Sequence, residues 1–496
     1  MQIPLGGALR APSGLLGWPR RLACLLLALL LPVPALAGLP PEDQCPAIGV
    51  SPTGKASDAV LHRMQEGAQV SYELMPALRD LLPAEIWQNR RVFFYPGMQM
   101  VIGGCHRRYA VPSFYSEATA RFSRDVSVDG QGNLNGYVAG IPFPPDSIDP
   151  EARDAGVRWA WNLEHRFRGA GTHGNFRIAD IPGARGRTHL YEGFFFFLQT
   201  RHRADLADSN YRVPETDEGL WVAGGRFSKP TDARHLAWRQ IRPEETQQSY
   251  RVSDRTFVYV PTMRKVRRAA TAWVDGMYMP RFRVAGDAGG GGLPVGGNEF
   301  GGAMGAINPT SAVSVQQTEH LPRGFTFLAL RPNAYVWRLR GEREVLAPIN
   351  ITRTGFPLSK EREFGPHGLS VANDRWDVRW AVVLEGRIRS DDQDYQTVTL
   401  YIDYQTQQPL YVITKGSRGR ILDVGIPVHR FSGDVVNYPT WPNGEEANVF
   451  DPVAEVFYRV PDNSGWRRES YNARSTSAEE RVRRRFLSTD FLVRGR

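Results

Sequence analysis

The strongest constraint on the fold is a succession of short apolar runs between residues 190 and 260. β-Branched and aromatic residues dominate these runs, and such residues favour extended strands. Turn-forming residues separate the runs at short intervals, a spacing typical of an antiparallel meander. The four predicted strands are residues 190–200, 219–222, 237–241 and 255–260.

The strand pattern resumes in the second half of the chain. A turn at residues 405–409 joins two of the later runs and predicts a hairpin. The 49 glycines, 36 prolines, 24 phenylalanines, 18 tyrosines and 12 tryptophans suit a strand-rich protein with many turns. The main later runs are 325–330, 335–339, 376–388, 395–402 and 410–414.

Helical and irregular segments are predicted around these strands. Residues 38–170 are interpreted as a helical and extended N-terminal part, with a short strand at 92–95. A helix is predicted at 149–168, because Asp149 is a favourable capping residue at its start. Residues 433–475 are rich in polar and turn residues, so no strand is predicted there.

Four consecutive phenylalanines, Phe194 to Phe197, occupy the first strand of the meander. Alternate residues of a strand face opposite sides, so two rings are expected on each face. Both faces must then be covered. Either helices and loops pack on the two sides, or part of one face lines an apolar cavity.

A basic run follows the last strand of the meander. Pro261 ends that strand, and Arg264, Lys265, Arg267 and Arg268 follow within seven residues. One interpretation is a solvated strand end, since charge runs usually face water. The alternatives are a basic rim beside an apolar cavity, suited to an acidic head group, and a surface that docks on an acidic transporter.

The first 37 residues have the pattern of a secretory signal peptide. Arg20 and Arg21 precede an apolar run at 22–31, and residues 35–37 form a small-x-small cleavage signal. The apolar run is too short to span a membrane. We therefore expect an exported mature chain that begins at Gly38.

Export sets the relevant charge and cysteine chemistry. Residues 1–37 contain three arginines and no acids, so their removal lowers the formal net charge from +9 to +6. That excess is too small for a chain of this length to indicate nucleic-acid binding. Cys45 and Cys105 remain, and we expect a disulfide between them in an oxidising compartment.

Residues 38–475 are assigned to a single β-rich domain. Within it, residues 285–305 hold ten glycines in twenty-one positions and are predicted to form a flexible loop or lid. Residues 476–496 are predicted to form a basic C-terminal helix and tail.

Catalytic and metal-binding motifs are missing from the sequence. It contains neither a His-Glu-x-x-His zinc motif nor a Gly-x-Ser-x-Gly nucleophile turn. His165, His173 and His189 are close in sequence, but ordinary core or surface roles are more common for such residues than a metal site. We expect no catalytic residue, metal or cofactor.

Several short motifs occur in order along the chain. They are Gly-Ile-Pro-Phe-Pro at 140–144, Trp-Asn-Leu-Glu-His-Arg-Phe-Arg-Gly at 161–169, Tyr-Val-Pro and the basic run at 259–268, Tyr-Val-Trp-Arg-Leu-Arg-Gly at 335–341, the strand at 375–386 and Thr-Leu-Tyr-Ile-Asp at 399–403. Together they resemble a family of secreted Gram-negative proteins called domain of unknown function 1329. His165 lies one or two positions from its place in the family pattern, and residues 285–333 agree poorly.

The resemblance implies both a fold and a function. The family is distantly similar to periplasmic lipoprotein carriers, whose curved antiparallel sheet wraps apolar ligands beneath short helices. We therefore expect an α+β, β-rich fold: one large curved antiparallel sheet, shaped as a half barrel, with helices packed over it. The implied role is a non-catalytic periplasmic binder or carrier of a lipid or other hydrophobic molecule, associated with the outer membrane or with an inner-membrane efflux-type transporter.

The candidate ligand contacts combine aromatic strand residues with the basic run. Two other functions remain open, a periplasmic hydrolase with a site assembled from distant residues and a scaffold of an outer-membrane complex. The candidate contacts are Phe194, Phe196, Tyr259, Arg264, Lys265, Arg267, Arg268 and Trp337.

Overall fold

One long, mostly antiparallel sheet dominates the computed structural model. The structure describes residues 39–46, 65–181, 189–214, 219–271, 276–277, 282–283, 314–315, 329–353, 364–390, 395–461, 466–474, 486–488 and 490–494. All of them lie in the unit Leu39–Arg496. Within these residues, fifteen strands form one sheet and four more form two small two-stranded sheets.

The strands of the large sheet are β1 (Gln69–Val70), β2 (Met100–Cys105), β5 (Gly171–Ile181), β6 (His189–Gln199), β7 (Trp221–Lys229), β8 (Ala237–Arg242), β9 (Asp254–Val260), β10 (Lys265–Thr271), β13 (Tyr335–Ala347), β14 (Arg375–Ile388), β15 (Thr397–Asp403), β16 (Pro409–Lys415), β17 (Ile421–Phe431), β18 (Phe450–Arg459) and β19 (Trp466–Arg474). The small sheets pair β3 (Ser127–Val128) with β4 (Leu134–Asn135) and β11 (Phe282–Arg283) with β12 (Ser314–Val315).

Helices are short and lie between the strands. The α-helices are α1 (Ala84–Gln88), α2 (Arg90–Phe93), α3 (Ser113–Phe122), α4 (Ala155–Glu164) and α6 (Asp490–Arg494). The 3₁₀ segments are η2 (Tyr72–Leu81), η3 (Ser123–Asp125), η4 (Pro145–Ser147), η5 (Ala204–Ser209), η6 (Thr231–Ala233), η7 (Glu244–Gln247), η8 (Pro261–Met263), η10 (Pro332–Ala334), η11 (Ser417–Gly419) and η12 (Ser432–Asp434). None of the helices in the described part of the chain has the length and apolar character needed to cross a membrane.

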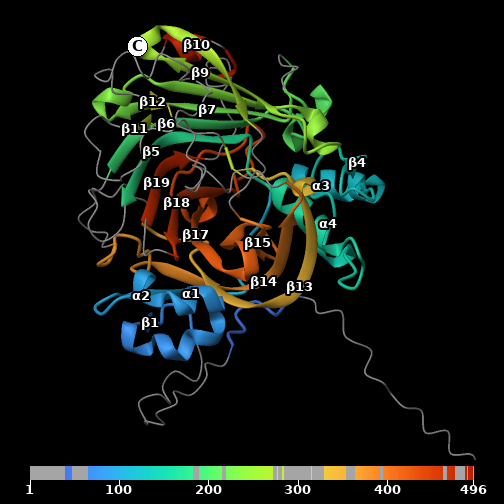
Figure 1. Cartoon of the computed structure of the whole chain (residues 1–496). Helices are drawn as coiled ribbons and strands as arrows, with labels where there is room; N and C mark the ends of the chain where they lie inside the picture. Colours follow the sequence, from blue (N-terminus) through green and yellow to red (C-terminus); the bar gives the residue numbers. More distant parts are fainter. Residues whose placement is uncertain are drawn as a thin grey trace, which may run out of the picture. The chain divides into compact units, whose positions relative to one another are not determined.

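The large sheet curls into a half barrel, as predicted (Figure 1). Its order runs β1-β2-β14-β15-β16-β17-β18-β19-β5-β6-β7-β8-β9-β10, and β13 pairs with β14. The helix α4 lies on the inner side of the curl, while α1 and α2 lie outside it (Figure 1). We call these two sides the concave face and the convex face.

The predicted meander is present as β6, β7, β8 and β9, paired antiparallel in chain order. The predicted hairpin is present as β15 and β16. In β6, Phe195 and Phe197 pack in the concave-face cluster with Trp238, whereas Phe196 packs in a separate cluster on the convex face with Phe194 at its border. The expected division of two rings to each face is therefore confirmed.

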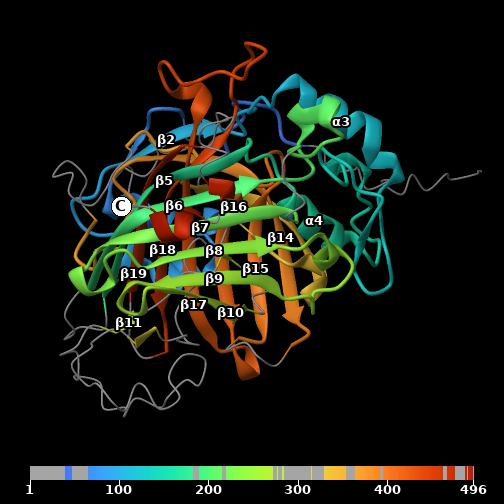
Figure 2. The ribbon, with the colours of Figure 1, turned by 90° about the horizontal axis from the view of Figure 1, so that it is seen from above.

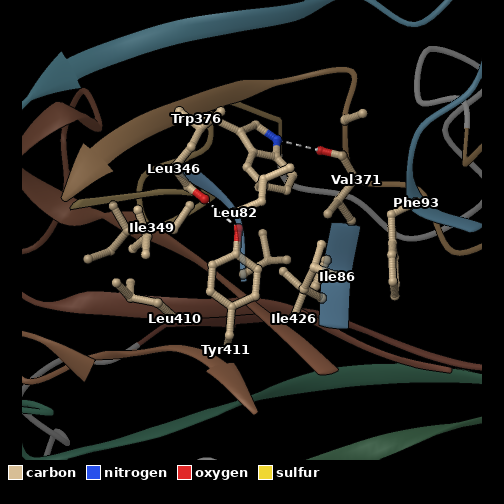
Figure 3. Packing of buried hydrophobic residues seen from close by; sticks show 14 of the residues in the cluster. Leu82, Ile86, Phe93, Leu346, Ile349, Val371, Trp376, Leu410, Tyr411 and Ile426 are labelled. Carbon is tan, nitrogen blue, oxygen red and sulfur yellow. Dashed lines mark hydrogen bonds between the residues drawn. The ribbon is translucent and has the colours of Figure 1, made fainter. Parts of the chain in front are cut away.

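Most of the core lies on the two faces of the β13–β18 half of the sheet. On the convex face, η2, α1 and α2 cover a cluster that includes Leu82, Ile86 and Tyr411 (Figure 3). Within it, the Trp376 indole donates to the Val371 carbonyl at 3.0 Å, and the Tyr411 hydroxyl donates to the Leu346 carbonyl (Figure 3). Full burial of such side chains contributes roughly 1.5–3 kcal/mol each.

The helix α4 is shorter than predicted at both ends. The Asp149 carboxylate accepts from the Glu151 amide at 3.0 Å, which closes a local turn before the helix instead of capping it. At the other end, the guanidinium of Arg166 donates to the Leu163 carbonyl at 2.6 Å, and that of Arg168 donates to the Glu164 carbonyl. These side chains satisfy carbonyls of the last turn, so the chain can leave the helix at Glu164.

Two predictions about secondary structure are wrong. Residues 92–95 do not form a strand, because Val92 and Phe93 end the helix α2. The segment predicted to be turn-rich, 433–475, contains β18 and β19. Pro452 is tolerated in β18 because it pairs with His429 at a bulge, where the ladder is already interrupted.

The N-terminal arm is joined to the sheet by the predicted disulfide. Cys45 and Cys105 are bonded, with their Cα atoms 5.1 Å apart. The Asp43 amide also donates to the Cys105 carbonyl at 2.9 Å. The predicted signal peptide, the glycine-rich segment 285–305 and residues 475–485 lie outside the described residues.

Candidate functional site

A groove of about 550 Å³ lies across β5, β6 and β7 and beside the loop that leads to β8. We call it the convex-face groove, because Phe194 and Arg226 in its lining belong to the same cross-strand row of that face. Its volume is within the range of pockets that hold one small ligand. Its lining comprises Asn175, Phe176, Arg177, Glu192, Gly193, Phe194, Arg226, Phe227, Ser228, Arg234 and His235.

Strand register brings the central groove residues together. Asn175 on β5 pairs with Phe194 on β6, which in turn pairs with Arg226 on β7. Directly opposed residues project to the same face at about 5 Å spacing. An amide, a phenyl ring and a guanidinium are therefore neighbours in one row, although 51 residues separate the first from the last.

Gly193 allows the strands to approach closely beside the groove. A Cβ atom at this position would lie 2.3 Å from the Arg226 carbonyl and 2.6 Å from Cζ of Phe176. A larger residue would displace the backbone of β7 or the ring of Phe176. The position thus requires glycine for packing at this end of β6.

The groove lining contains more basic than acidic side chains. Glu192 forms ion pairs with Arg177 and with Lys229, whose Nζ lies 2.9 Å from Glu192 Oε2. Burial raises the pKa of Glu192, but the bonds from Lys229 and Arg177 outweigh burial and hold that pKa below its ordinary value. The carboxylate is thus ionised and compensated at neutral pH, and Arg226 and Arg234 give the lining an excess of positive charge.

Of the predicted ligand contacts, Phe194 lines this groove. Phe196 is one row away and buried under the C-terminal residues Phe486 and Phe491. Tyr259 is half-buried on the convex face of β9, where it pairs with Ala237 of β8. These three residues share one face, as the prediction requires.

Trp337 lies elsewhere. It is buried on β13 in the cluster beneath α4, and its indole donates to the Pro332 carbonyl at 2.8 Å. The ring packs against Gly386, which has no side chain. A Cβ atom at that position would lie 2.6 Å from Trp337 Cζ3 and would clash with the ring. This residue has the contacts of a core side chain, and a role in ligand binding remains only a prediction.

The predicted basic residues lie on an exposed hairpin. Arg264 forms the turn with φ 50°, and Lys265, Arg267 and Arg268 lie on β10, the last strand in the sheet order. All four are exposed. They are three strands from β7, and the groove lining does not include them. A rim or docking role for them is untested.

The sequence interpretation missed Arg177, Arg226, Arg234 and His235. It ended the second meander strand at residue 222, whereas β7 continues to Lys229. Gly224 and Gly225 weaken the strand signal at that point. Extending the period-two pattern past them would have kept Arg226 within the predicted strand.

A second set of charged residues, the buried ionic cluster, lies away from the groove. It contains Glu164, Arg168, Arg242, Asp254 and Arg331, all nearly inaccessible to solvent. Asp254 lies 2.6 Å from the Arg331 guanidinium and 3.2 Å from that of Arg242. Burial raises the pKa of Glu164 and lowers that of Arg331 to about 10.

This cluster holds distant elements together. It links the end of α4, β8, β9 and the residue before η10, and the Leu330 amide donates to Glu164 at 2.6 Å. Removing one partner of such a buried pair leaves an uncompensated charge, which is strongly destabilising. Among the described residues, no group of three His, Cys, Asp or Glu side chains is placed to hold a metal ion.

Two of the three histidines that are close in sequence, His165 and His173, lie in different surroundings. His165 is buried against Tyr137 and His202, whereas His173 contacts Phe486 on the convex face. Burial lowers the pKa of His165 well below its ordinary value, with His202 adding to the effect.

The convex-face groove therefore offers a phenyl ring beside guanidinium groups. An apolar chain can pack on the ring, and an acidic head group can accept charge-assisted hydrogen bonds from the arginines.

Comparison with known proteins gives one family and several solved structures. The family model described as "Protein of unknown function (DUF1329)" matches residues 78–284 and 325–480. A comparison with curated protein sequences finds no match.

Three solved structures match this chain at low sequence identity. A putative outer membrane lipoprotein-sorting protein domain from Vibrio parahaemolyticus is 11% identical, covers 65% of this chain and 93% of its own, and has a TM-score of 0.34. A DUF1329 family protein from Desulfovibrio piger is 10% identical, with coverages of 66% and 93% and a TM-score of 0.36. A LolA superfamily protein from Nitrosomonas europaea is 12% identical, with coverages of 66% and 94% and a TM-score of 0.32.

Proposed function

Because the chain belongs to the DUF1329 family of proteins of unknown function, its role has to be inferred from its own residues, and we propose that it binds a hydrophobic molecule without changing it chemically. The observation that carries this proposal is the convex-face groove, which joins Phe194 to Arg177, Arg226 and Arg234. The ligand we propose is a lipid or a similar molecule with an apolar chain.

We further propose that the protein works in the periplasm. The disulfide between Cys45 and Cys105 supports this location, because such bonds persist in oxidising compartments. A carrier there would exchange its ligand with a membrane partner, either an inner-membrane efflux-type transporter or an outer-membrane protein. The exposed basic residues of β10 are the surface we propose for that contact.

Direct binding measurements test the proposal. Delipidated protein is titrated with a dansyl-labelled fatty acid, and Phe194→Ala is compared with wild type. Loss of one aromatic contact of about 1–2 kcal/mol weakens binding roughly 5- to 30-fold. The matched control is Val436→Ala, which removes an apolar side chain that is 86% exposed and outside the groove.

The expected result is saturable binding by wild type and the control, with clear weakening in Phe194→Ala. Mass spectrometry of the recovered ligand should show an unchanged molecule. Equal affinity in all three proteins would reject the groove, and conversion of the ligand to a product would favour a hydrolase instead.

A further inference from the structure

The strand β10 is the last strand in the order of the large sheet. Within the described residues it pairs with β9 alone, from Lys265 opposite Val260 to Thr271 opposite Asp254. Figure 2 shows the strands from β6 to β10 following one another across the sheet. The edge of β10 that faces away from β9 therefore has backbone N–H and C=O groups that no strand in the described part of the chain takes up.

Basic side chains occupy both faces of the sheet at this edge. Lys265 and Arg267 lie opposite two valines of β9 that belong to the concave-face cluster. Val266 and Arg268 alternate with them and lie opposite two aromatic residues of β9 on the convex face. The strand thus presents cations on either side of its backbone.

These cations are exposed and have no acidic partner among the described residues. Arg264, in the turn before the strand, is exposed in the same way, and Val266 between the charges is 42% exposed. By contrast, Arg340 on β13 forms an ion pair with Glu385 of the neighbouring β14. The edge at β10 therefore combines unpaired strand edge, uncompensated positive charge and an exposed apolar side chain.

The distribution of charge distinguishes between the possible occupants of this edge. An antiparallel pair of two β10 strands in full register would place Arg268 opposite its own equivalent, and a parallel pair would do so for every basic residue. Like charges directly opposite each other are destabilising, so a second copy is a poor occupant. A flat membrane surface would meet the charges of one face only. An added strand meets both faces, because its side chains alternate as those of β10 do.

We propose that β10 receives an acidic, extended segment of a partner protein as an additional strand of the sheet. Main-chain hydrogen bonds along the edge supply affinity, and acidic side chains opposite Lys265, Arg267 and Arg268 supply specificity. An apolar residue of the same segment covers Val266. This inference rests on the proposed exchange of ligand with a membrane partner, and it adds the chemistry and the geometry of that contact.

Binding is measured with a synthetic strand designed for this edge. The probe is the fluorescein-labelled peptide Thr-Val-Val-Glu-Glu-Val-Glu, which in antiparallel register puts glutamates opposite Lys265, Arg267 and Arg268 and a valine opposite Val266. Its anisotropy should show saturable binding to the protein that weakens with added salt. A peptide with glutamine in place of each glutamate should bind roughly fivefold more weakly, or worse.

Backbone methylation separates strand addition from simple attraction of charge. Alternate residues of a strand direct their N–H groups to opposite edges. Two further peptides with the same charge are N-methylated, one at the odd positions and the other at the even positions. One of them should lose binding, because its donors toward β10 are gone, and the other should keep it. Hydrogen exchange of the amides of residues 265–271 should also slow in the bound protein. Equal binding by the two methylated peptides would overturn the inference.

Protein variants locate the bound peptide. Lys265→Gln combined with Arg267→Gln should weaken peptide binding roughly fivefold or more. The matched control is Arg418→Gln combined with Arg420→Gln, which removes the same charge from two exposed residues in the turn between β16 and β17. The control should bind the peptide as wild type does. Equal weakening in both pairs would assign binding to the net charge of the protein and overturn the inference.

Two parallel titrations separate this inference from the proposed function. The dansyl fatty acid is titrated into the same samples, and phosphatidylglycerol vesicles are tested for binding to the protein. Binding of the fatty acid without binding of the peptide would overturn the inference and leave the proposed function standing. Binding of the vesicles through Lys265 and Arg267 without binding of the peptide would assign the edge to a membrane surface instead. Binding of the peptide without binding of the fatty acid would support the strand site and overturn the proposed function.

Discussion

Lowering the pH from 7 to 5 should destabilise the protein, in part through the single side chain of His429. This residue lies on β17, is 5% exposed and contacts the edge of Phe450. Burial lowers its pKa to about 3, and the neighbouring cation of Arg166 contributes to the shift. In the unfolded chain, the imidazole returns to an ordinary pKa of about 6.5.

The sign of the effect follows from these two pKa values. Between pH 6.5 and 3, the unfolded state binds a proton at His429 and the folded state does not, so stability falls as the pH falls. Each pH unit in this window costs about 1.4 kcal/mol. From pH 6.5 to 5, the loss is therefore about 2 kcal/mol from this residue alone.

The assay compares His429→Gln with wild type by urea unfolding at pH 7, 6 and 5, followed by tryptophan fluorescence. Other buried groups, among them His165, His202 and Glu164, titrate in both proteins, so their effects cancel in the difference between them. The gap in unfolding free energy between wild type and variant should shrink by about 2 kcal/mol between pH 7 and pH 5.

The control is Val436→Ala, which shortens an apolar side chain that is 86% exposed and leaves every titratable group in place. Its unfolding free energy should run parallel to that of wild type. A gap for His429→Gln that stays constant with pH would show that the buried imidazole takes up a proton in the folded state, and the reasoning from burial would fail.

Four other outcomes are expected. Replacing Cys45 and Cys105 by serine should lower the unfolding free energy by about 4 kcal/mol, since the disulfide closes a loop of 60 residues. Chemical denaturation measures this loss, and a value below about 1 kcal/mol would contradict the prediction. Asp254→Asn should cost about 3–5 kcal/mol by the same method, because it leaves buried guanidinium groups uncompensated; a neutral effect would show that they are otherwise satisfied. The Lys265→Gln, Arg267→Gln double variant should weaken binding to a membrane partner at low salt and flatten its salt dependence, and unchanged binding would assign the hairpin to solvent. Deleting residues 288–302 should leave the melting temperature nearly unchanged, and loss of cooperative unfolding would show that they are structural.

Much of the meander could be predicted because its period of two is explicit in the sequence. The four phenylalanines divide between the faces as the pleat requires, and β8 and β9 begin within one residue of the prediction. The strand β7 was cut short, because Gly224 and Gly225 carry little intrinsic strand preference. Pairing with β6 on one side and β8 on the other overrides that weakness.

The strand β19 shows where pattern fails altogether. Its sequence, Trp-Arg-Arg-Glu-Ser-Tyr-Asn-Ala-Arg, does not alternate between apolar and polar residues. It is extended because β18 and β5 supply hydrogen-bonding partners on both of its edges. The local sequence of β19 cannot indicate these two partners, because β5 is almost 300 residues earlier in the chain. For the same reason, the stacking of Phe486 on Phe196 could not be predicted.

The position of the groove determines which movement ligand exchange requires. On the concave side, the buried ionic cluster joins β8 and β9 to the residues before β13, and breaking one of its pairs costs about 3–5 kcal/mol. A movement that separates β8 and β9 from the residues before β13 therefore has to break these ion pairs. On the convex face, the groove across β5, β6 and β7 is lined by Phe194 and Arg226, and its lining includes no residue of the buried ionic cluster. Under the proposed function, a ligand bound in this groove can therefore be exchanged without breaking the ion pairs of the buried ionic cluster.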